Sequence, residues 1–132
     1  MAEGFARTYG SDVMEAVSAG LGPAFEVSPM TVTTMKEKNI DMSAAVPRGV
    51  DAVDRAGLSL IVNISGQKLP ARDVPMVEWE VRDPIGRDEK VFREVRDQIE
   101  HLVMGLILQL RAQEKAEAKQ PERFDTHGRL FR

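Results

Sequence analysis

The chain has 132 residues, of which 42% are hydrophobic and 30% are charged, and this length is typical of one domain with a core of ordinary size. Its net charge of −3 argues against a general nucleic-acid-binding protein, and because it shows neither a bilayer-length apolar run nor a signal-peptide start, we expect a cytoplasmic protein with no membrane partner. It contains no cysteine and two histidines, so disulfides, zinc–thiolate sites, iron–sulfur clusters and cysteine nucleophiles are excluded for these residues, and we expect neither a metal nor a cofactor.

The first predicted elements are a short helix and a short strand. The helix covers residues 1–9 and ends at Gly10, because its apolar side chains recur at helical spacing. The segment 15–19 is short and is followed by glycine and proline, which favours a brief strand.

A second helix is predicted to begin at Ser28 and Pro29. The serine side chain can accept a hydrogen bond from a free backbone N–H, and proline suits the first helical position. The helix is expected to run to about Asn39, which can adopt the left-handed conformation that ends many helices.

The middle of the chain predicts two further strands. A short helical stretch at 50–56 precedes the segment 58–64, whose nearly continuous apolar run is typical of a strand covered on both faces. In the segment 77–81, apolar and acidic residues alternate as in a half-buried edge strand. Residues 83–86, Asp-Pro-Ile-Gly, predict a turn.

A long final helix is predicted after Asp88, whose side chain can cap it. Between Leu102 and Leu110 nearly every side of this helix is apolar, which favours either a buried end of the core or a surface patch that pairs with another chain. Residues 113–132 are polar and mixed in charge, and they are predicted to form a flexible tail after a domain of residues 1–112.

The order of these elements is helix, strand, helix, strand, strand, helix, with connections long enough for parallel pairing. It predicts an α/β protein, a three-layer sandwich around a small and mostly parallel sheet.

Several fragments of the sequence, taken in their order and spacing, resemble a known protein family. They are MAEGFA (1–6), SAG (18–20), SPMTVTTMKE (28–37), IDMS (40–43), LIV (60–62), VEWEVRDP (77–84) and VFREVRDQI (91–99). Together they resemble the low-molecular-weight protein-tyrosine phosphatases and the related arsenate reductases, over residues 1 to about 111.

The resemblance implies a two-step phosphoryl transfer. In the family, a cysteine in a C-x5-R loop at the start of the first helix attacks the phosphate, while backbone N–H groups, the helix dipole and the arginine hold its oxygens. An aspartic acid then protonates the leaving oxygen and later activates water. This catalytic role carries over to Asp83, which from the residues alone is a turn-forming residue before Pro84.

The sequence departs from the family pattern in two places. It starts where the C-x5-R loop should have ended, so the cysteine, the arginine and the first strand have no counterpart. A phosphate- or arsenate-type oxyanion is therefore expected as a ligand only if that loop is restored. The segment 63–68, where thioredoxin-coupled arsenate reductases carry two further cysteines, has no thiol, which leaves a phosphatase or a reductase that uses an external thiol.

Two hypotheses of function follow. In the first, the chain is a family enzyme whose N-terminal strand and loop are missing from the sequence, as a wrongly placed start codon would cause, and it is inactive as given. In the second, it is a non-catalytic relative that forms a homodimer or binds a partner. Because the sheet order of the family is 2-1-3-4, both hypotheses remove an interior strand, and we expect the remaining strands to close up or another chain to fill the gap.

Other candidate residues point less clearly to a site. Arg87, Arg93 and Arg96 either meet an anion near the Asp-Pro loop or, as their spacing favours, form a solvated helix face paired with acidic residues of the same helix. His101 is expected to be a partly buried helix residue, and Gly20-Leu21-Gly22 is expected to be a plain turn.

Overall fold

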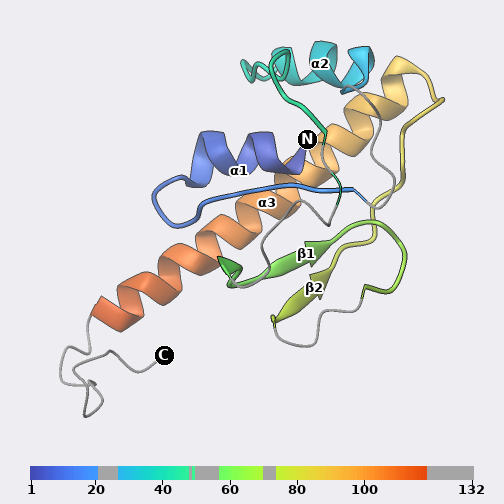
Figure 1. Ribbon diagram of the computed structural model, residues 1–132. Coiled ribbons are helices and arrows are strands. Elements are labelled where there is room, and N and C mark those ends of the chain that lie inside the picture. The colour runs from blue at the N-terminus through green and yellow to red at the C-terminus, as the bar shows by residue number, and fades with distance from the viewer. Residues whose placement is uncertain (21–26, 48, 50–56, 70–73, 119–132) are drawn as a thin grey trace.

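A computed structural model describes residues 1–20, 27–47, 49, 57–69 and 74–118. Three helices and two strands are found there: α1 (Ala2–Gly10), α2 (Pro29–Lys36), β1 (Ile61–Asn63), β2 (Met76–Glu78) and α3 (Glu89–Ala118). In Figure 1, α3 crosses the view diagonally, α1 and α2 lie along one side of it, and the strands lie along the other. The predicted α/β class with a small parallel sheet is confirmed.

The sheet of the described residues consists of β1 and β2, paired in parallel with Val62 opposite Val77. Two backbone hydrogen bonds extend the pairing, from Ile61 N to Pro75 O at 2.9 Å and from Trp79 N to Asn63 O at 2.9 Å. Both strands are shorter than the predicted segments 58–64 and 77–81. A strand lasts only as long as its neighbour supplies hydrogen-bond partners, and here each strand has one described neighbour.

The predicted strand at 15–19 is absent, and only a single parallel bridge joins Gly20 to Gly49. Side chains of α1 hold this segment instead of a neighbouring strand. Ser18 Oγ donates to the carboxylate of Glu3, and Arg7 Nε donates to Ala16 O at 3.3 Å. The expected closing up of the remaining strands is therefore not seen, because the segment 15–19 does not join β1 and β2 in the described sheet.

Helix α2 starts where it was predicted, with Pro29 in its first turn, but the side chain of Ser28 makes no capping hydrogen bond. The helix ends at Lys36, before the predicted end at Asn39. Tighter bonds continue the turn, because Lys38 N donates to Met35 O and Asn39 N donates to Lys36 O, both at 2.9 Å. Asn39 has the predicted left-handed conformation, with φ of 61°.

Helix α3 has the predicted cap, since Asp88 Oδ1 accepts a hydrogen bond from Val91 N at 3.1 Å. The helix continues to Ala118, so residues 113–118 of the predicted tail are helical. Residues 113–118 are mostly alanine, glutamate, lysine and glutamine, which are strong helix formers even when exposed. The predicted helical stretch at 50–56 and residues 119–132 lie outside the described residues.

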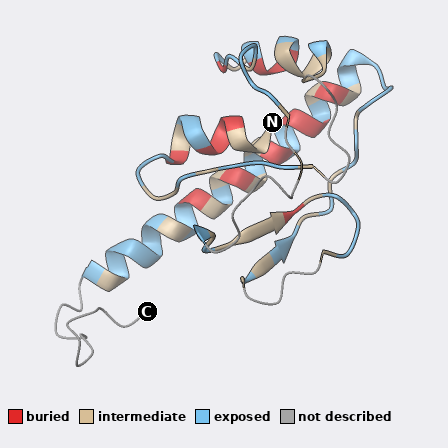
Figure 2. Ribbon diagram, viewed as in Figure 1, coloured by how far each residue is buried: buried red, intermediate tan, exposed pale blue. Residues whose placement is uncertain are grey.

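The core lies between α3 and the two shorter helices (Figure 2). On α3 its residues are four apart and therefore share one face: Val95, Ile99, Val103 and Ile107. From α1, α2 and the segment after α2 it takes Phe5, Ala6, Met35 and Ile40. In the apolar stretch 102–110, Val103 and Ile107 are buried, as the predicted buried end of the core requires, whereas Leu108 is 60% exposed.

Candidate active-site pocket

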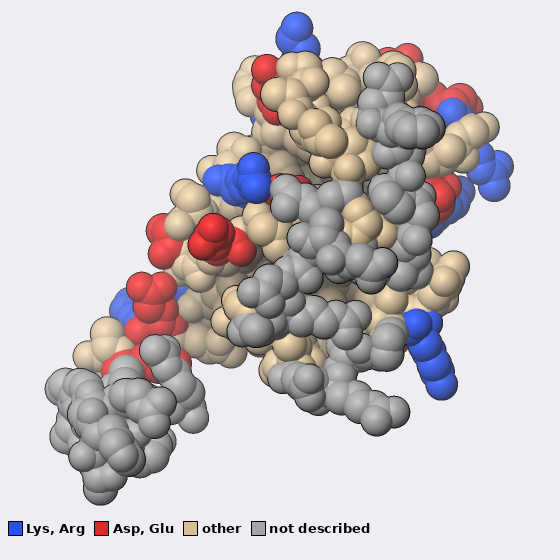
Figure 3. Space-filling model, in the orientation of Figure 1, with Lys and Arg blue, Asp and Glu red and all other residues tan. Residues whose placement is uncertain are grey.

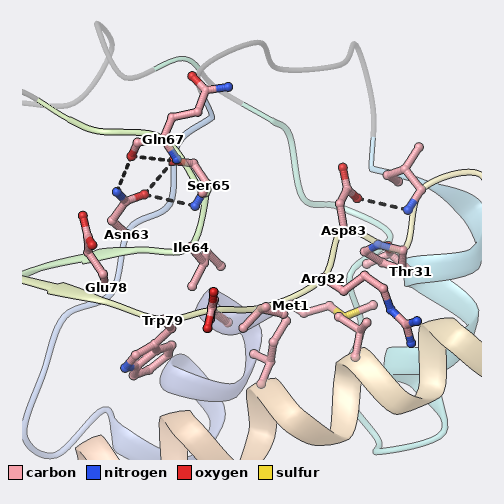
Figure 4. Close-up of a pocket in the computed structure, with 18 of the residues that line it drawn as sticks. Met1, Thr31, Asn63, Ile64, Ser65, Gln67, Glu78, Trp79, Arg82 and Asp83 are labelled. Atoms are coloured by element: carbon pink, nitrogen blue, oxygen red, sulfur yellow. Dashed lines mark hydrogen bonds between the residues drawn. The ribbon is translucent and has the colours of Figure 1, made fainter.

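A pocket of about 770 Å³ lies where the two parallel strands end and α1 begins (Figure 4). Ligands of open α/β sheets bind in this position, beyond the carboxyl ends of the strands. The segment 63–68 begins at the last residue of β1, the segment 78–85 begins at the last residue of β2, and both line the pocket. The remaining lining residues come from the three helices and their flanks: Met1, Ala2, Thr31, Val95 and Ile99.

The loop after β1 is fixed by the buried side chain of Asn63, which is 4% exposed. Asn63 Oδ1 accepts hydrogen bonds from Ser65 N at 3.0 Å and from Ser65 Oγ at 2.6 Å. Asn63 Nδ2 donates to Gln67 O at 2.7 Å, and Gln67 N donates to Ser65 Oγ at 3.1 Å. A polar network thus fixes the conformation of the segment 63–68, which contains no cysteine.

Asp83 lies on the other side of the pocket from Asn63 and Ser65 (Figure 4). It is exposed, and its Oδ1 accepts a hydrogen bond from Ile85 N at 3.0 Å. Arg87 N donates to Pro84 O at 2.9 Å, and Gly86 has φ of 79°, a conformation that favours glycine. The predicted turn at 83–86 is confirmed, and Asp83 forms it while facing the pocket.

The charges of the described pocket lining do not by themselves favour an oxyanion. Its two basic side chains are Lys68 and Arg82, and its three acidic ones are Glu78, Glu80 and Asp83. Arg82 is already paired, with Nη2 at 3.2 Å from Oε2 of Glu94. On the face shown in Figure 3, basic and acidic side chains are likewise interspersed rather than separated by sign.

The start of α1 is the part of the pocket whose electrostatics favour negative charge. Met1 and Ala2 line the pocket, and no side chain caps this helix. The first backbone N–H groups of a helix and its dipole favour negative charge at this position. Burial lowers the pKa of the Met1 amino group, and the nearby Glu3 carboxylate opposes that shift.

Two of the three arginines considered as anion ligands are occupied outside the pocket. Arg93 Nη2 lies 2.8 Å from Oε2 of Glu37 and 2.6 Å from Oε1 of Glu89. Arg96 is 6% exposed and donates to Thr34 O at 3.0 Å and to Glu37 Oε1 at 2.5 Å. The expectation of a solvated helix face is thus wrong for Arg96, which lies buried between α3 and the end of α2.

The remaining candidate residues from the sequence do not line the pocket as described. Arg87 is exposed and does not line the pocket. His101 is exposed, so the expectation that it is partly buried is wrong, because the buried stripe of α3 passes through Ile99 and Val103 instead. In Gly20-Leu21-Gly22, the last two residues lie outside the described residues.

Sequence reasoning missed Glu37 and the role of Asn63. The arginines Arg93 and Arg96 hold the pKa of Glu37 down, at about 2, and their partnership joins residues 56 and 59 positions apart. No local pattern signals such a distant pair. The polar Asn63 at the end of an apolar run was a usable signal, because a buried amide needs hydrogen-bond partners.

The described segments contain no cluster of three histidine, aspartate or glutamate residues that could hold a metal ion. Within the same segments, no helix combines the length and the apolarity that crossing a bilayer requires.

Comparisons with known proteins agree with one another. A family model described as low molecular weight phosphotyrosine protein phosphatase matches residues 1–116. A glutaredoxin arsenate reductase of Synechocystis sp. is 30% identical over 115 residues, which cover 83% of this chain and 87% of that protein. An arsenate reductase 1 of Bacillus cereus is 34% identical over 110 residues, or 75% of this chain and 77% of that protein.

A solved structure gives the same result for the fold. The crystal structure of arsenate reductase from Archaeoglobus fulgidus matches with a TM-score of 0.73 and 28% sequence identity, over 80% of this chain and 86% of that one. The matched residues 1–116 contain every described element except the last residues of α3. This chain therefore belongs to the low molecular weight phosphotyrosine protein phosphatase family.

Proposed function

We propose that this chain supplies the general acid, Asp83, of an arsenate reductase-type site that binds an oxyanion. Its 132 residues perform no thiol chemistry by themselves. One observation carries the proposal: the start of α1, the loop 63–68 and Asp83 line a single pocket, while the chain holds no cysteine. The nucleophile of the family mechanism is a thiolate, and no other residue type supplies it. The expected cytoplasmic location is part of the same proposal.

The arsenate reductase branch is favoured over the phosphatase branch by the relatives. Those of Synechocystis sp. and Bacillus cereus, and the structure from Archaeoglobus fulgidus, are all named arsenate reductases. The loop 63–68 holds Asn63, Ser65 and Gln67 in a closed polar network and offers no thiol for an internal relay. A reductase built on this chain therefore needs an external thiol, in keeping with the name of the Synechocystis relative.

In such a site each part of the pocket has a separate task. The start of α1 stabilises the charge of the bound oxyanion, and Asp83 protonates the oxygen that leaves. The acidic balance of the remaining lining residues makes anion binding dependent on the C-x5-R loop, which brings both an arginine and a ring of backbone N–H groups. Without that loop we expect neither binding nor turnover.

The test uses the chain as printed beside the same chain preceded by a family strand and C-x5-R loop. The printed chain should neither hydrolyse an aryl phosphate nor reduce arsenate in the presence of glutathione and glutaredoxin. The extended chain should reduce arsenate, and Asp83→Asn should lower its kcat by about 10²-fold or more. Exchange of the loop cysteine for serine is the matched control and should abolish turnover.

Three outcomes contradict parts of this proposal. Turnover by the printed chain would show that a thiol is not needed. Hydrolysis of the aryl phosphate without arsenate reduction by the extended chain would assign it to the phosphatase branch. Full activity of the Asp83→Asn variant would remove Asp83 from the catalytic residues and leave it as a turn-forming residue.

A second candidate function is self-association as a homodimer, and one observation favours it. Leu108 of α3 is 60% exposed, although the neighbouring Ile107 is buried. An apolar residue on this face can pack against the same face of a second copy. Sedimentation velocity should show a dimer that Leu108→Glu converts to a monomer with an unchanged circular dichroism spectrum, whereas a monomer at every concentration would reject this candidate.

A further inference from the structure

We propose that Glu94 and Gln98 of α3 are positioning residues for Asp83. Together they hold residues 80–82 against α3, and this fixes the position of Asp83 in the lining of the pocket. The inference rests on the proposed function, because it assigns these residues a role toward the group that we propose as the acid.

The contacts of this segment carry the inference. Gln98 Nε2 donates to the backbone oxygen of Glu80 at 3.0 Å. Arg82 Nη2 donates to Glu94 Oε2 at 3.2 Å. Between these two tethers Val81 packs against the core, so the segment is held by one apolar and two polar contacts immediately before Asp83.

The spacing of the two tethers fits the geometry of both partners. Glu94 and Gln98 are one helical turn apart, which separates them by about 6 Å along the helix axis. Glu80 and Arg82 are two residues apart in an extended segment, which separates them by about 6.6 Å. The two tethers can therefore form together in this register, whereas a slip by one residue would break both contacts and turn Val81 away from the core.

The tethers act on position more than on global stability. The side chains of Arg82 and Glu94 are 53% and 51% exposed, and ion pairs with this exposure contribute little to the free energy of unfolding. On the far side of Asp83 the turn is closed by its own bonds, from Ile85 N to Asp83 Oδ1 and from Arg87 N to Pro84 O. Loss of a tether should thus leave the fold intact but loosen the Asp83 end of the turn, where Ile85 N donates to Asp83 Oδ1.

Nuclear magnetic resonance on the printed chain tests this inference, with the Ile85 amide as the reporter. This amide donates to the carboxylate of Asp83 at 3.0 Å, so its exchange with solvent reports on the loop. We expect Glu94→Gln to speed its exchange about two- to fivefold, and Gln98→Ala to speed it about two- to tenfold.

Two further variants separate positioning from a general structural effect. Glu100→Gln removes the same charge from the same helix, but Glu100 pairs with Lys38 instead, so the Ile85 amide should behave as in the unchanged chain. The double variant Arg82→Glu, Glu94→Arg reverses the ion pair and should restore the slow exchange lost in Glu94→Gln. Circular dichroism checks that each variant has the same Tm.

An Ile85 amide that behaves in Glu94→Gln and Gln98→Ala as it does in Glu100→Gln would overturn the inference. A charge reversal that leaves exchange as fast as in Glu94→Gln would remove Glu94 from the positioning residues. Neither result depends on turnover. Failure of the proposed function appears instead as an extended chain that is inactive, or that is indifferent to Asp83→Asn, whatever the Ile85 amide does.

Discussion

Gly10 at the end of α1 lies against Ile107 of α3 so closely that a Cβ atom on Gly10 would be 2.7 Å from Ile107 Cγ1 and 2.9 Å from its Cδ1. Ile107 is fully buried and has little room to move, because interiors of proteins are close-packed. The absence of a side chain at Gly10 therefore sets how near the two helices approach.

Replacement of Gly10 by alanine should destabilise the protein. The added methyl group overfills the contact with Ile107, which typically costs about 1–3 kcal/mol and exceeds the helix-propensity gain of alanine over glycine. Urea unfolding measures the change in the free energy of unfolding.

The control for this prediction is Gly105→Ala in α3, where a Cβ atom would meet nothing within 4 Å. It should stabilise the protein by about 0.5–1 kcal/mol. Equal effects of the two substitutions would show that the close approach of Gly10 and Ile107 does not govern the packing. Ile107→Val should relieve part of the destabilisation in the Gly10→Ala background.

The lowered pKa of Glu37 makes the stability of the protein depend on pH. Arg93, and then Arg96, hold the pKa of Glu37 at about 2, below its ordinary value of 4.5. A group whose pKa is lowered by folding stabilises the native state above its unfolded pKa, and this contribution is lost as the pH falls. The contribution of Glu37 should therefore be complete at neutral pH and should decrease from about pH 4.5 toward pH 2.

The measurement compares the free energy of unfolding of Glu37→Gln with that of the unchanged chain over this pH range. The variant should be less stable at pH 7, because the buried Arg96 loses a carboxylate partner, and the difference should shrink in acid. Arg111 lowers the pKa of Asp12 in the same direction, but that effect is common to both proteins and cancels. A difference that is constant with pH would contradict the prediction.

Because the side-chain amide of Asn63 is buried, we expect its replacement by aspartate to lower the free energy of unfolding. Its Nδ2 donates to Gln67 O at 2.7 Å, and a carboxylate oxygen there would face the carbonyl oxygen without a proton between them. Asn63→Asp should destabilise the protein by about 1–3 kcal/mol at neutral pH, and less in acid where the carboxyl group is protonated. Thermal unfolding at several pH values measures this.

Ser65→Ala provides the comparison for Asn63. It removes the hydroxyl that donates to Asn63 Oδ1 but leaves the bond from Ser65 N to the same atom at 3.0 Å. Its effect should be smaller, about 0.5–1.5 kcal/mol, and independent of pH. Reversal of this order would show that the loop 63–67 is not held by Asn63.

The cap of α3 gives a prediction at the junction between the Asp83 turn and the helix. Asp88 Oδ1 accepts the hydrogen bond of Val91 N. Asp88→Ala should cost about 0.5–2 kcal/mol, whereas Asp88→Asn should be nearly neutral because asparagine caps as well as aspartate does. Equal losses in both variants would assign the effect to the charge near the helix dipole rather than to the hydrogen bond.

Local signals were sufficient for the ends of several elements. Pro29, Asn39 and Asp88 act through bonds and backbone conformations that involve residues at most four positions away, so the sequence around them contains the cause. The turn at 83–86 is predictable for the same reason. The apolar stripe of α3 was visible because helical spacing places its residues on one face.

The errors of sequence reasoning arise where the cause lies far along the chain. The segment 15–19 has the composition of a strand, but a strand needs a neighbour, and Arg7 and Glu3 of α1 supply hydrogen bonds to it instead. Arg96 has the spacing of an exposed helix residue, yet Thr34 and Glu37 cover it. The pocket itself unites residues 1–2 with residues 83–85, and only the folded backbone places them together.

The packing of α3 determines when this protein can fold during synthesis. Phe5 of α1 and Met35 of α2 are fully buried, and the helix against which α1 and α2 pack is α3, which is translated last of the described elements. A nascent chain on the ribosome therefore exposes these side chains until residues 95–107 have left the exit tunnel. Domains that depend on such late contacts fold only after most of the chain is made and are prone to aggregate before then.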